Sequence, residues 1–189
     1  MKRDLGVAAG LAVGLIVGPG QAAPLPGGQA VAPRRAFMLK LSAFDQGTVR
    51  RALDLARAKL VSPGCAQIYA DFGLPGGGTA QDALAGLGIV PEEFLETLVF
   101  TDGSGEPVCR MGRAMLTTRP GTSMIFVCPG FARFQIRSPG LSASLIIHES
   151  LHALGLGEDP PSSNEITRRV ERRCGNLAKR TTAQLAGID

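Results

Sequence analysis

The placement of two histidines is the feature that most constrains how this chain can fold. His148 and His152 are the only histidines among 189 residues, and they stand four positions apart within an apolar stretch over residues 141–154. Residues four positions apart lie on the same face of an α-helix. The sequence therefore predicts a buried helix that begins after Ser138-Pro139, ends at Gly155 and carries two imidazoles one above the other.

Residues 148–152 read His-Glu-Ser-Leu-His and fit the pattern H-E-x-x-H. Two imidazoles with this spacing can bind one Zn²⁺, and the glutamate between them can reach a water on the metal. The pattern predicts Zn²⁺ as cofactor, His148 and His152 as metal ligands, and Glu149 as catalytic base. The alternative is a pair of core histidines satisfied by hydrogen bonds, with Glu149 paired to an arginine.

The longer stretch over residues 148–158, H-E-S-L-H-A-L-G-L-G-E, resembles the metzincin signature H-E-x-x-H-x-x-G-x-x-H of the zincin metallopeptidases. In that family the glycine lets the helix stop and turn, and the last position supplies a third zinc ligand. Here the last position is Glu158, and a carboxylate is a sound ligand for zinc. Metzincins also carry a methionine turn after the third ligand, whereas the last methionine of this chain is Met124. The resemblance implies a zincin-like metallopeptidase with a metzincin-type ligand loop and no closer kinship.

Two other carboxylates compete with Glu158 for the third ligand position. Asp159 is adjacent, and it would point elsewhere if Glu158 binds. The gluzincin branch takes its third ligand from a glutamate on a following helix, which here would be Glu165. Twelve residues separate Glu165 from His152, which is short for that branch, and Ser162 with Glu165 fits a helix-capping box. Glu158 is therefore favoured, and Glu165 stays open.

The group that would stabilise an oxyanion is not evident from the motif. The chain has one tyrosine and no third histidine, which leaves Tyr69 and Arg137 as candidates. A tyrosine more often packs in a core and an arginine is more often solvated.

The N-terminus has the pattern of a secretory signal peptide. Lys2 and Arg3 precede an apolar stretch over residues 5–17, which is too short to span a bilayer, and Ala22-Ala23 supplies the small residues of a cleavage site. We therefore expect a signal peptide over 1–23, a Pro/Gly-rich leader over 24–35, and one domain over 36–189. The expected location is secreted or periplasmic, without membrane contact after cleavage; an uncleaved membrane anchor is the alternative.

Four cysteines fall within the expected domain: Cys65, Cys109, Cys128 and Cys174. In an oxidising compartment an even number predicts two disulfides, for which three pairings are possible. No two of these cysteines have the short spacing of a zinc knuckle, so a structural zinc site built from them is disfavoured.

The rest of the chain predicts an α+β domain with one core. The expected elements are an extended segment over 36–44, a helix over 47–60, a short helix or strand over 66–73, a flexible loop over 76–78, helices over 80–87 and 91–98, and a hairpin of strands over 107–117 and 123–128. The resemblance to zincins implies a small, mostly antiparallel sheet, with the strand over 123–128 at the cleft, where it would pair with an extended substrate.

The net charge of +4 is modest, and the bases gather near the C-terminus: Arg168, Arg169, Arg172, Arg173, Lys179 and Arg180. No aromatic residues interleave with them, so a solvated helix face is favoured and nucleic-acid binding is not indicated.

Taken together, these patterns predict an exported zinc-dependent metallopeptidase that hydrolyses peptide bonds with a zinc-bound water activated by Glu149. The expected partner is a peptide or protein substrate. One alternative is an exported zincin-like binding or assembly module that keeps its metal site without turnover, and another is a disulfide-stapled structural protein without a metal.

Overall fold

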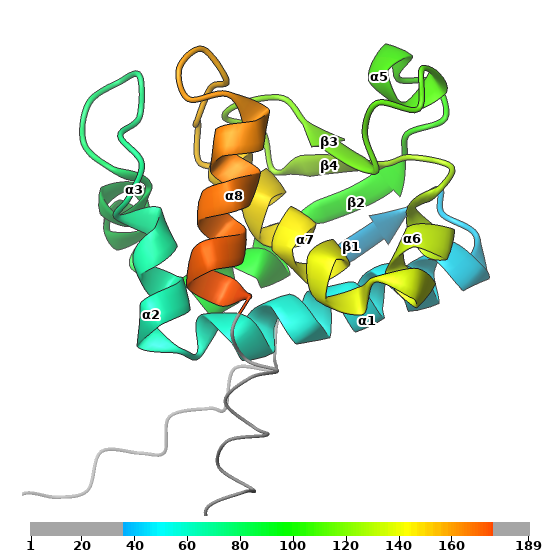
Figure 1. The fold of residues 1–189 in the computed structure, drawn as a ribbon, viewed down its shortest axis with the longest axis horizontal. Helices are drawn as coiled ribbons and strands as arrows, with labels where there is room; N and C mark the ends of the chain where they lie inside the picture. The colour runs from blue at the N-terminus through cyan, green and yellow to red at the C-terminus, as the bar shows by residue number, and fades with distance from the viewer. Residues whose placement is uncertain (1–35, 176–189) are drawn as a thin grey trace, which may run out of the picture. The chain divides into compact units, whose positions relative to one another are not determined.

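The computed structural model describes residues 36–175, an α+β domain (Figure 1). The predicted signal peptide and leader lie outside the described residues, as does the segment 176–189 of the predicted domain. The elements in chain order are β1 (Phe37–Leu39), α1 (Ala43–Leu60), α2 (Pro63–Ala66), the 3₁₀ turn η1 (Gln67–Tyr69), α3 (Ala80–Leu87), α4 (Pro91–Phe94), the 3₁₀ turn η2 (Leu95–Thr97), β2 (Val99–Asp102), α5 (Pro107–Arg110), β3 (Leu116–Thr118), β4 (Met124–Val127), α6 (Phe131–Arg137), α7 (Pro139–Ala153) and α8 (Ser163–Cys174).

The four described strands form one mixed sheet in the order β1-β2-β4-β3. β1 pairs with β2 and β2 with β4 in parallel, and only β3 and β4 pair antiparallel. The prediction of a mostly antiparallel sheet is therefore wrong. Parallel neighbours need a crossover connection, and helices connect β1 to β2 in this way, so that both strands run in the same direction. Only β3 and β4 are joined by a tight turn, which makes them antiparallel.

The predicted strand over 107–117 is wrong for most of its length. Pro107 opens the short helix α5, where its missing N–H costs nothing, and the strand begins only at Leu116. The predicted strand over 123–128 is confirmed as β4, but it is paired on both sides by β2 and β3. β4 therefore has no free edge for a substrate, and the free edge near α7 belongs to β3.

The predicted helix over 47–60 is confirmed but begins earlier, at Ala43. Ser42 caps it by accepting a hydrogen bond from the Asp45 N–H at 3.1 Å, so the predicted extended segment over 36–44 shrinks to β1. The apolar face predicted for this helix, which includes Val49 and Leu53, is buried.

The segment between α1 and β3 was partly predicted. Helix α3 has the predicted bounds, and the predicted loop over 76–78 is a turn in which Gly77 and Gly78 adopt positive φ. The predicted helix over 91–98 divides into α4 and η2, and the segment over 66–73 contains η1. Strand β2 and helix α6 were not predicted, because each is short and directly adjoins another element.

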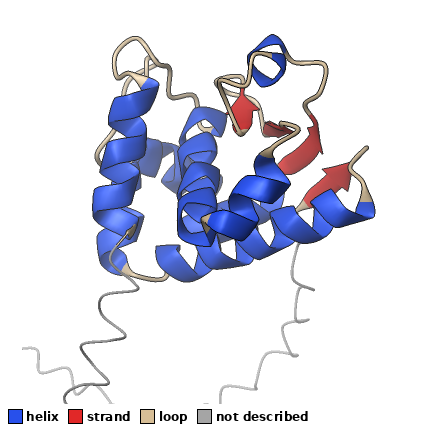
Figure 2. Ribbon diagram, turned by 45° about the vertical axis from the view of Figure 1, so that its right-hand side comes forward, coloured by secondary structure: helices blue, strands red, loops and turns tan. Residues whose placement is uncertain are grey.

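Helix α7 runs through the middle of the described domain, as predicted for the histidine-bearing helix. It packs on α1, α6, α8 and β3 (Figure 1), and Figure 2 shows the strands gathered beside the helices. Ile146, Ile147 and Leu151 on this helix are fully buried. α7 is therefore held on several sides, which fixes the positions of its side chains.

Two disulfides cross-link the domain. Cys65 pairs with Cys174, 109 residues away, and Cys109 pairs with Cys128, 19 residues away. The first joins α2 to the end of α8, where the buried Lys59 also donates a hydrogen bond to the Cys174 carbonyl at 2.7 Å. Disulfides are consistent with an extracellular protein. Within residues 36–175, no helix combines the length and apolar character needed to cross a bilayer.

Replacing Cys65 and Cys174 together with alanine should lower the free energy of unfolding by about 4 kcal/mol, because the disulfide closes a long loop in the unfolded chain. The Cys109–Cys128 disulfide closes a shorter loop, so the matched pair Cys109→Ala with Cys128→Ala should lose about 1.5 kcal/mol less. Urea unfolding of both double variants checks this. A smaller loss for the Cys65 and Cys174 pair would contradict it.

Candidate metal centre

The last turns of α7 bring two imidazoles together. His148 and His152 are each 3 % exposed, and their Nε2 atoms lie 2.9 Å apart. The spacing of four residues on an α-helix brings the rings together, with their planes inclined at 62°.

A sharp turn after α7 adds a carboxylate to this pair. Gly155 adopts a φ of 108°, a conformation that side chains rarely tolerate, and the Leu156 N–H returns to the Leu151 carbonyl at 3.1 Å. The turn places Glu158 Oε1 3.2 Å from His152 Nε2 and 3.9 Å from His148 Nε2. These three residues form a group that can hold a metal ion, with all ligand atoms within 4.8 Å of one another.

The geometry of the three ligand atoms fits a small tetrahedral ion. Their separations of 2.9, 3.2 and 3.9 Å bracket the value of about 3.4 Å expected between ligands bound at about 2.1 Å in a tetrahedral site. The two histidines are buried, and the Glu158 side chain is 51 % exposed. The group therefore opens to solvent on the side of Glu158.

The second nitrogen of each ring is held by a neighbouring oxygen. His152 Nδ1 lies 2.6 Å from the Leu156 carbonyl, and because a carbonyl only accepts, Nδ1 carries the proton and leaves Nε2 with a free lone pair. His148 Nδ1 lies 3.0 Å from the hydroxyl of Thr167 on α8. Such outer contacts orient metal-binding histidines and raise their basicity.

Burial keeps the first imidazole uncharged. Burial, and then the neighbouring His152, lowers the pKa of His148 to about 3. A neutral ring at physiological pH can bind a metal without first losing a proton.

Glu149 is a buried carboxyl next to the metal-binding group. It is 5 % exposed, and burial above all, together with the charge of Glu158, raises its pKa to about 8, against a smaller lowering effect of the Thr118 hydroxyl. By hydrogen-bond geometry, Glu149 Oε2 and Thr118 Oγ1 are the only buried side-chain nitrogen or oxygen atoms within residues 36–175 without a partner, although the Thr118 hydroxyl lies near enough to the Glu149 carboxyl to lower its pKa. Both orphaned atoms lie where α7 faces β3, so this place can accept a further polar group.

The other two carboxylates considered for the third position do not join the group. Glu165 forms an ion pair with Arg169 at 2.7 Å. Its N–H is capped by the Ser162 hydroxyl at 3.4 Å, so half of the predicted capping box is present. Asp159 is exposed and lies outside the group that can bind a metal.

Neither oxyanion candidate is placed beside the histidines. The buried Tyr69 shares a 2.6 Å hydrogen bond with Ser150, which is two residues from each histidine and so points to another side of α7; burial raises the pKa of this phenol. Arg137 ends α6, whereas His148 lies nine residues along α7 from its start at Pro139, which corresponds to about 14 Å of helix.

Thr167 and Thr118 contribute to the site and were not predicted. Thr167 belongs to a helix that the tertiary fold brings against α7, and nothing in its local sequence marks it. For Thr118 a partial signal exists, since it ends a strand before the predicted turn over 119–122.

No protein-family model, curated protein or solved structure matches this chain. The resemblance to zincins therefore depends on residues 148–158, and the chemistry has to follow from the geometry of the site.

Glu158→Ala should weaken zinc binding by at least about 100-fold, because it removes one of three ligands. The matched variant Glu165→Ala should change the dissociation constant by less than about threefold, since Glu165 serves the fold through Arg169. Competition with a chromogenic chelator measures both values. Equal losses in the two variants would show that the third ligand has been assigned wrongly.

The metal-free protein should lose about 1–2 kcal/mol of unfolding free energy between pH 6.5 and 8. In this window the folded state keeps the proton of Glu149, whose pKa is raised to about 8, while the unfolded state has lost it, so the folded state is penalised as the pH rises. His148, with its pKa lowered to about 3, is uncharged in both states at the upper part of this window.

Urea unfolding in the presence of a chelator checks the effect. Glu149→Gln should show a flat profile over the same window. A slope that persists in this variant would assign the titration to another group.

Proposed function

We propose that the protein is an exported zinc-dependent metallopeptidase. The observation that carries the proposal is the convergence of His148, His152 and Glu158 beside Glu149, a buried carboxyl with an orphaned oxygen. Two histidines and a carboxylate with an open fourth position are an established set for catalytic zinc. A bound zinc ion would polarise the substrate carbonyl and make water acidic enough to attack near neutral pH.

Glu149 is the general base in this proposal. The pKa of about 8 belongs to the metal-free protein, and the positive charge of a bound metal would lower it toward neutral pH. A carboxyl whose pKa lies near the working pH can both take and return a proton. Glu149 removes a proton from the attacking water and later donates it to the leaving amine. The Thr118 hydroxyl, whose oxygen is also without a partner, orients either the carboxyl or the substrate.

The free edge of β3 supplies a place for the peptide. Among the described strands, β3 is paired with β4 alone, so one row of its backbone groups can pair with an extended chain. Thr118 ends this strand beside Glu149, and the Gly121 N–H donates to the His152 carbonyl at 2.9 Å. A peptide on this edge would therefore pass the metal centre.

A binding or assembly module that keeps its metal without turnover is the second candidate. The observation that favours it is the burial of Glu149, of which only 5 % is exposed. A metal held between α7, the loop after it and α8 would then serve to stabilise the domain.

Export rests on the N-terminal pattern over residues 1–23 and on the two disulfides. Both disulfides would be maintained in the periplasm or outside the cell.

Glu149→Gln should lower kcat for peptide hydrolysis by about 10³-fold or more, because it removes the base and keeps the shape of the side chain. Its zinc content should equal that of the unchanged protein, since Glu149 is not a ligand. Glu165→Gln is the matched control and should keep full activity. Hydrolysis of a quenched peptide library, with elemental analysis of each preparation, measures this; zinc-loaded protein that cleaves no peptide would favour the binding module.

A further inference from the structure

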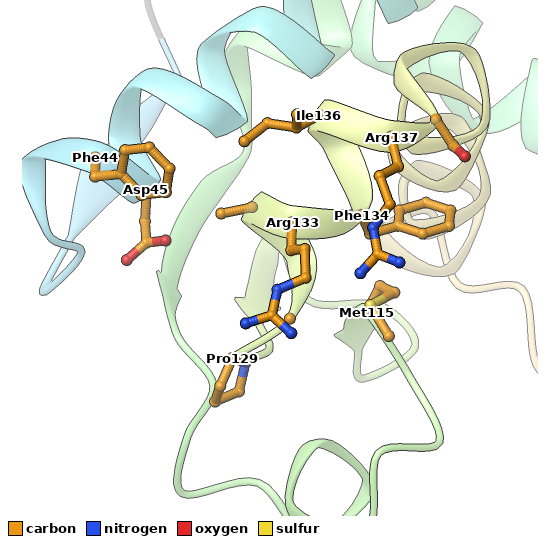
Figure 3. Close-up of a pocket in the computed structure, with 11 residues that line it drawn as sticks. Phe44, Asp45, Met115, Pro129, Arg133, Phe134, Ile136 and Arg137 are labelled. Atoms are coloured by element: carbon orange, nitrogen blue, oxygen red, sulfur yellow. The ribbon is translucent and has the colours of Figure 1, made fainter.

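A hollow in the surface of the described domain lies away from the metal centre. Its volume is about 790 Å³, and it is formed by the start of α1, the segment before β3, the segment after β4, and α6. Its lining contains none of the three candidate ligands. We call it the α6 groove (Figure 3).

The lining of the α6 groove combines apolar and cationic groups. Phe44 and Ile136 are 61 % and 62 % exposed, and Met115 and Phe134 also contribute to the wall. Exposed large apolar side chains grouped in a hollow are typical of a binding surface.

Arg133 and Arg137 add two positive charges to this wall. They are one helical turn apart, and Figure 3 shows Arg133 directed toward Pro129 and Arg137 toward Met115. None of the ion pairs formed within residues 36–175 includes either arginine. Asp45 is the acidic residue of the lining, and its carboxylate accepts a hydrogen bond from the Ser42 hydroxyl at 2.6 Å at the start of α1. The groove is therefore complementary to an anionic group that also carries apolar side chains.

Strand β3 connects the α6 groove to the metal centre. Met115, directly before β3, lines the groove, whereas Thr118 at its end lies beside Glu149. Along α7, Ser138 lines the groove and His148 follows ten residues later, which corresponds to about 15 Å of helix. An extended peptide covers that distance in four or five residues.

We infer that the α6 groove is a substrate subsite that selects an acidic residue next to an apolar one, four or five positions from the cleaved bond. This inference rests on the proposed peptidase function, because it takes the metal centre as the point of cleavage. Arg133 and Arg137 pair with the acidic side chain, and Phe44, Phe134 and Ile136 contact the apolar one. The substrates are therefore proteins with an acidic, partly apolar segment close to the cleaved bond.

The test uses fluorescent peptides that carry Asp-Phe four and five positions from a central amide, on either side of it, and counterparts with Lys-Phe. Binding is measured by anisotropy with zinc-loaded Glu149→Gln protein, so that affinity is read without turnover; cleavage is measured with the unmodified active site. The variant Arg133→Glu with Arg137→Glu is compared with Arg50→Glu and Arg172→Glu, two exposed arginines on α1 and α8.

We expect the acidic peptide of one orientation to bind about tenfold more tightly than its lysine counterpart. The Arg133 and Arg137 double variant should lose or reverse this preference, with the change in KM rather than in kcat, while the control double variant keeps it. Zinc content should be equal in all preparations.

Three results would overturn the inference. The first is equal affinity for acidic and lysine peptides in both orientations, and the second is an equal loss in the control variant. The third combines two observations: the protein shows no peptide preference, and it sediments with phosphatidylglycerol vesicles whereas the Arg133 and Arg137 double variant does not. This result would assign the groove to anionic lipid. If no peptide is cleaved but the arginine-dependent binding persists, the peptidase function fails and the acidic selectivity of the groove stands.

Discussion

The centre of this domain depends on hydrogen bonds that hold two buried imidazoles. A polar ring in an apolar core is costly unless its nitrogens find partners, and here each ring has one nitrogen bound to a neighbouring oxygen, from Leu156 or from Thr167. The remaining nitrogens are turned toward each other and toward Glu158. This arrangement leaves three ligand atoms within 4.8 Å of one another, where a cation could bind.

The partners of the histidines come from parts of the chain that the disulfides and the loop geometry keep in place. The turn at Gly155 presents both the Leu156 carbonyl and Glu158. Helix α8, which carries Thr167, is fastened at its far end by the Cys65–Cys174 disulfide and by the Lys59 hydrogen bond. The local bonds at the metal centre and the long-range links of the domain therefore support each other.

The sheet contributes no metal ligand, but its edge strand β3 packs against α7. The antiparallel pairing of β3 with β4 places Thr118 next to Glu149 and leaves the other edge of β3 without a strand partner in the part of the chain that the structure describes. The same strand begins at the α6 groove, where Arg133 and Arg137 form no ion pair with the described residues. A peptide that follows β3 would then meet a cationic, apolar surface at one end and the metal centre at the other.

The sequence by itself determined the central helix, the convergence of its two histidines and the preference for Glu158, because these depend on helical periodicity and on a glycine turn within eleven residues. It also predicted β4 and the existence of disulfides. Only the tertiary structure decided the parallel pairing of β1, β2 and β4, the choice of β3 as the free edge, and the contribution of Thr167. These features depend on contacts between residues far apart in the chain, such as His148 with Thr167 and Cys65 with Cys174, and local patterns carry no record of them.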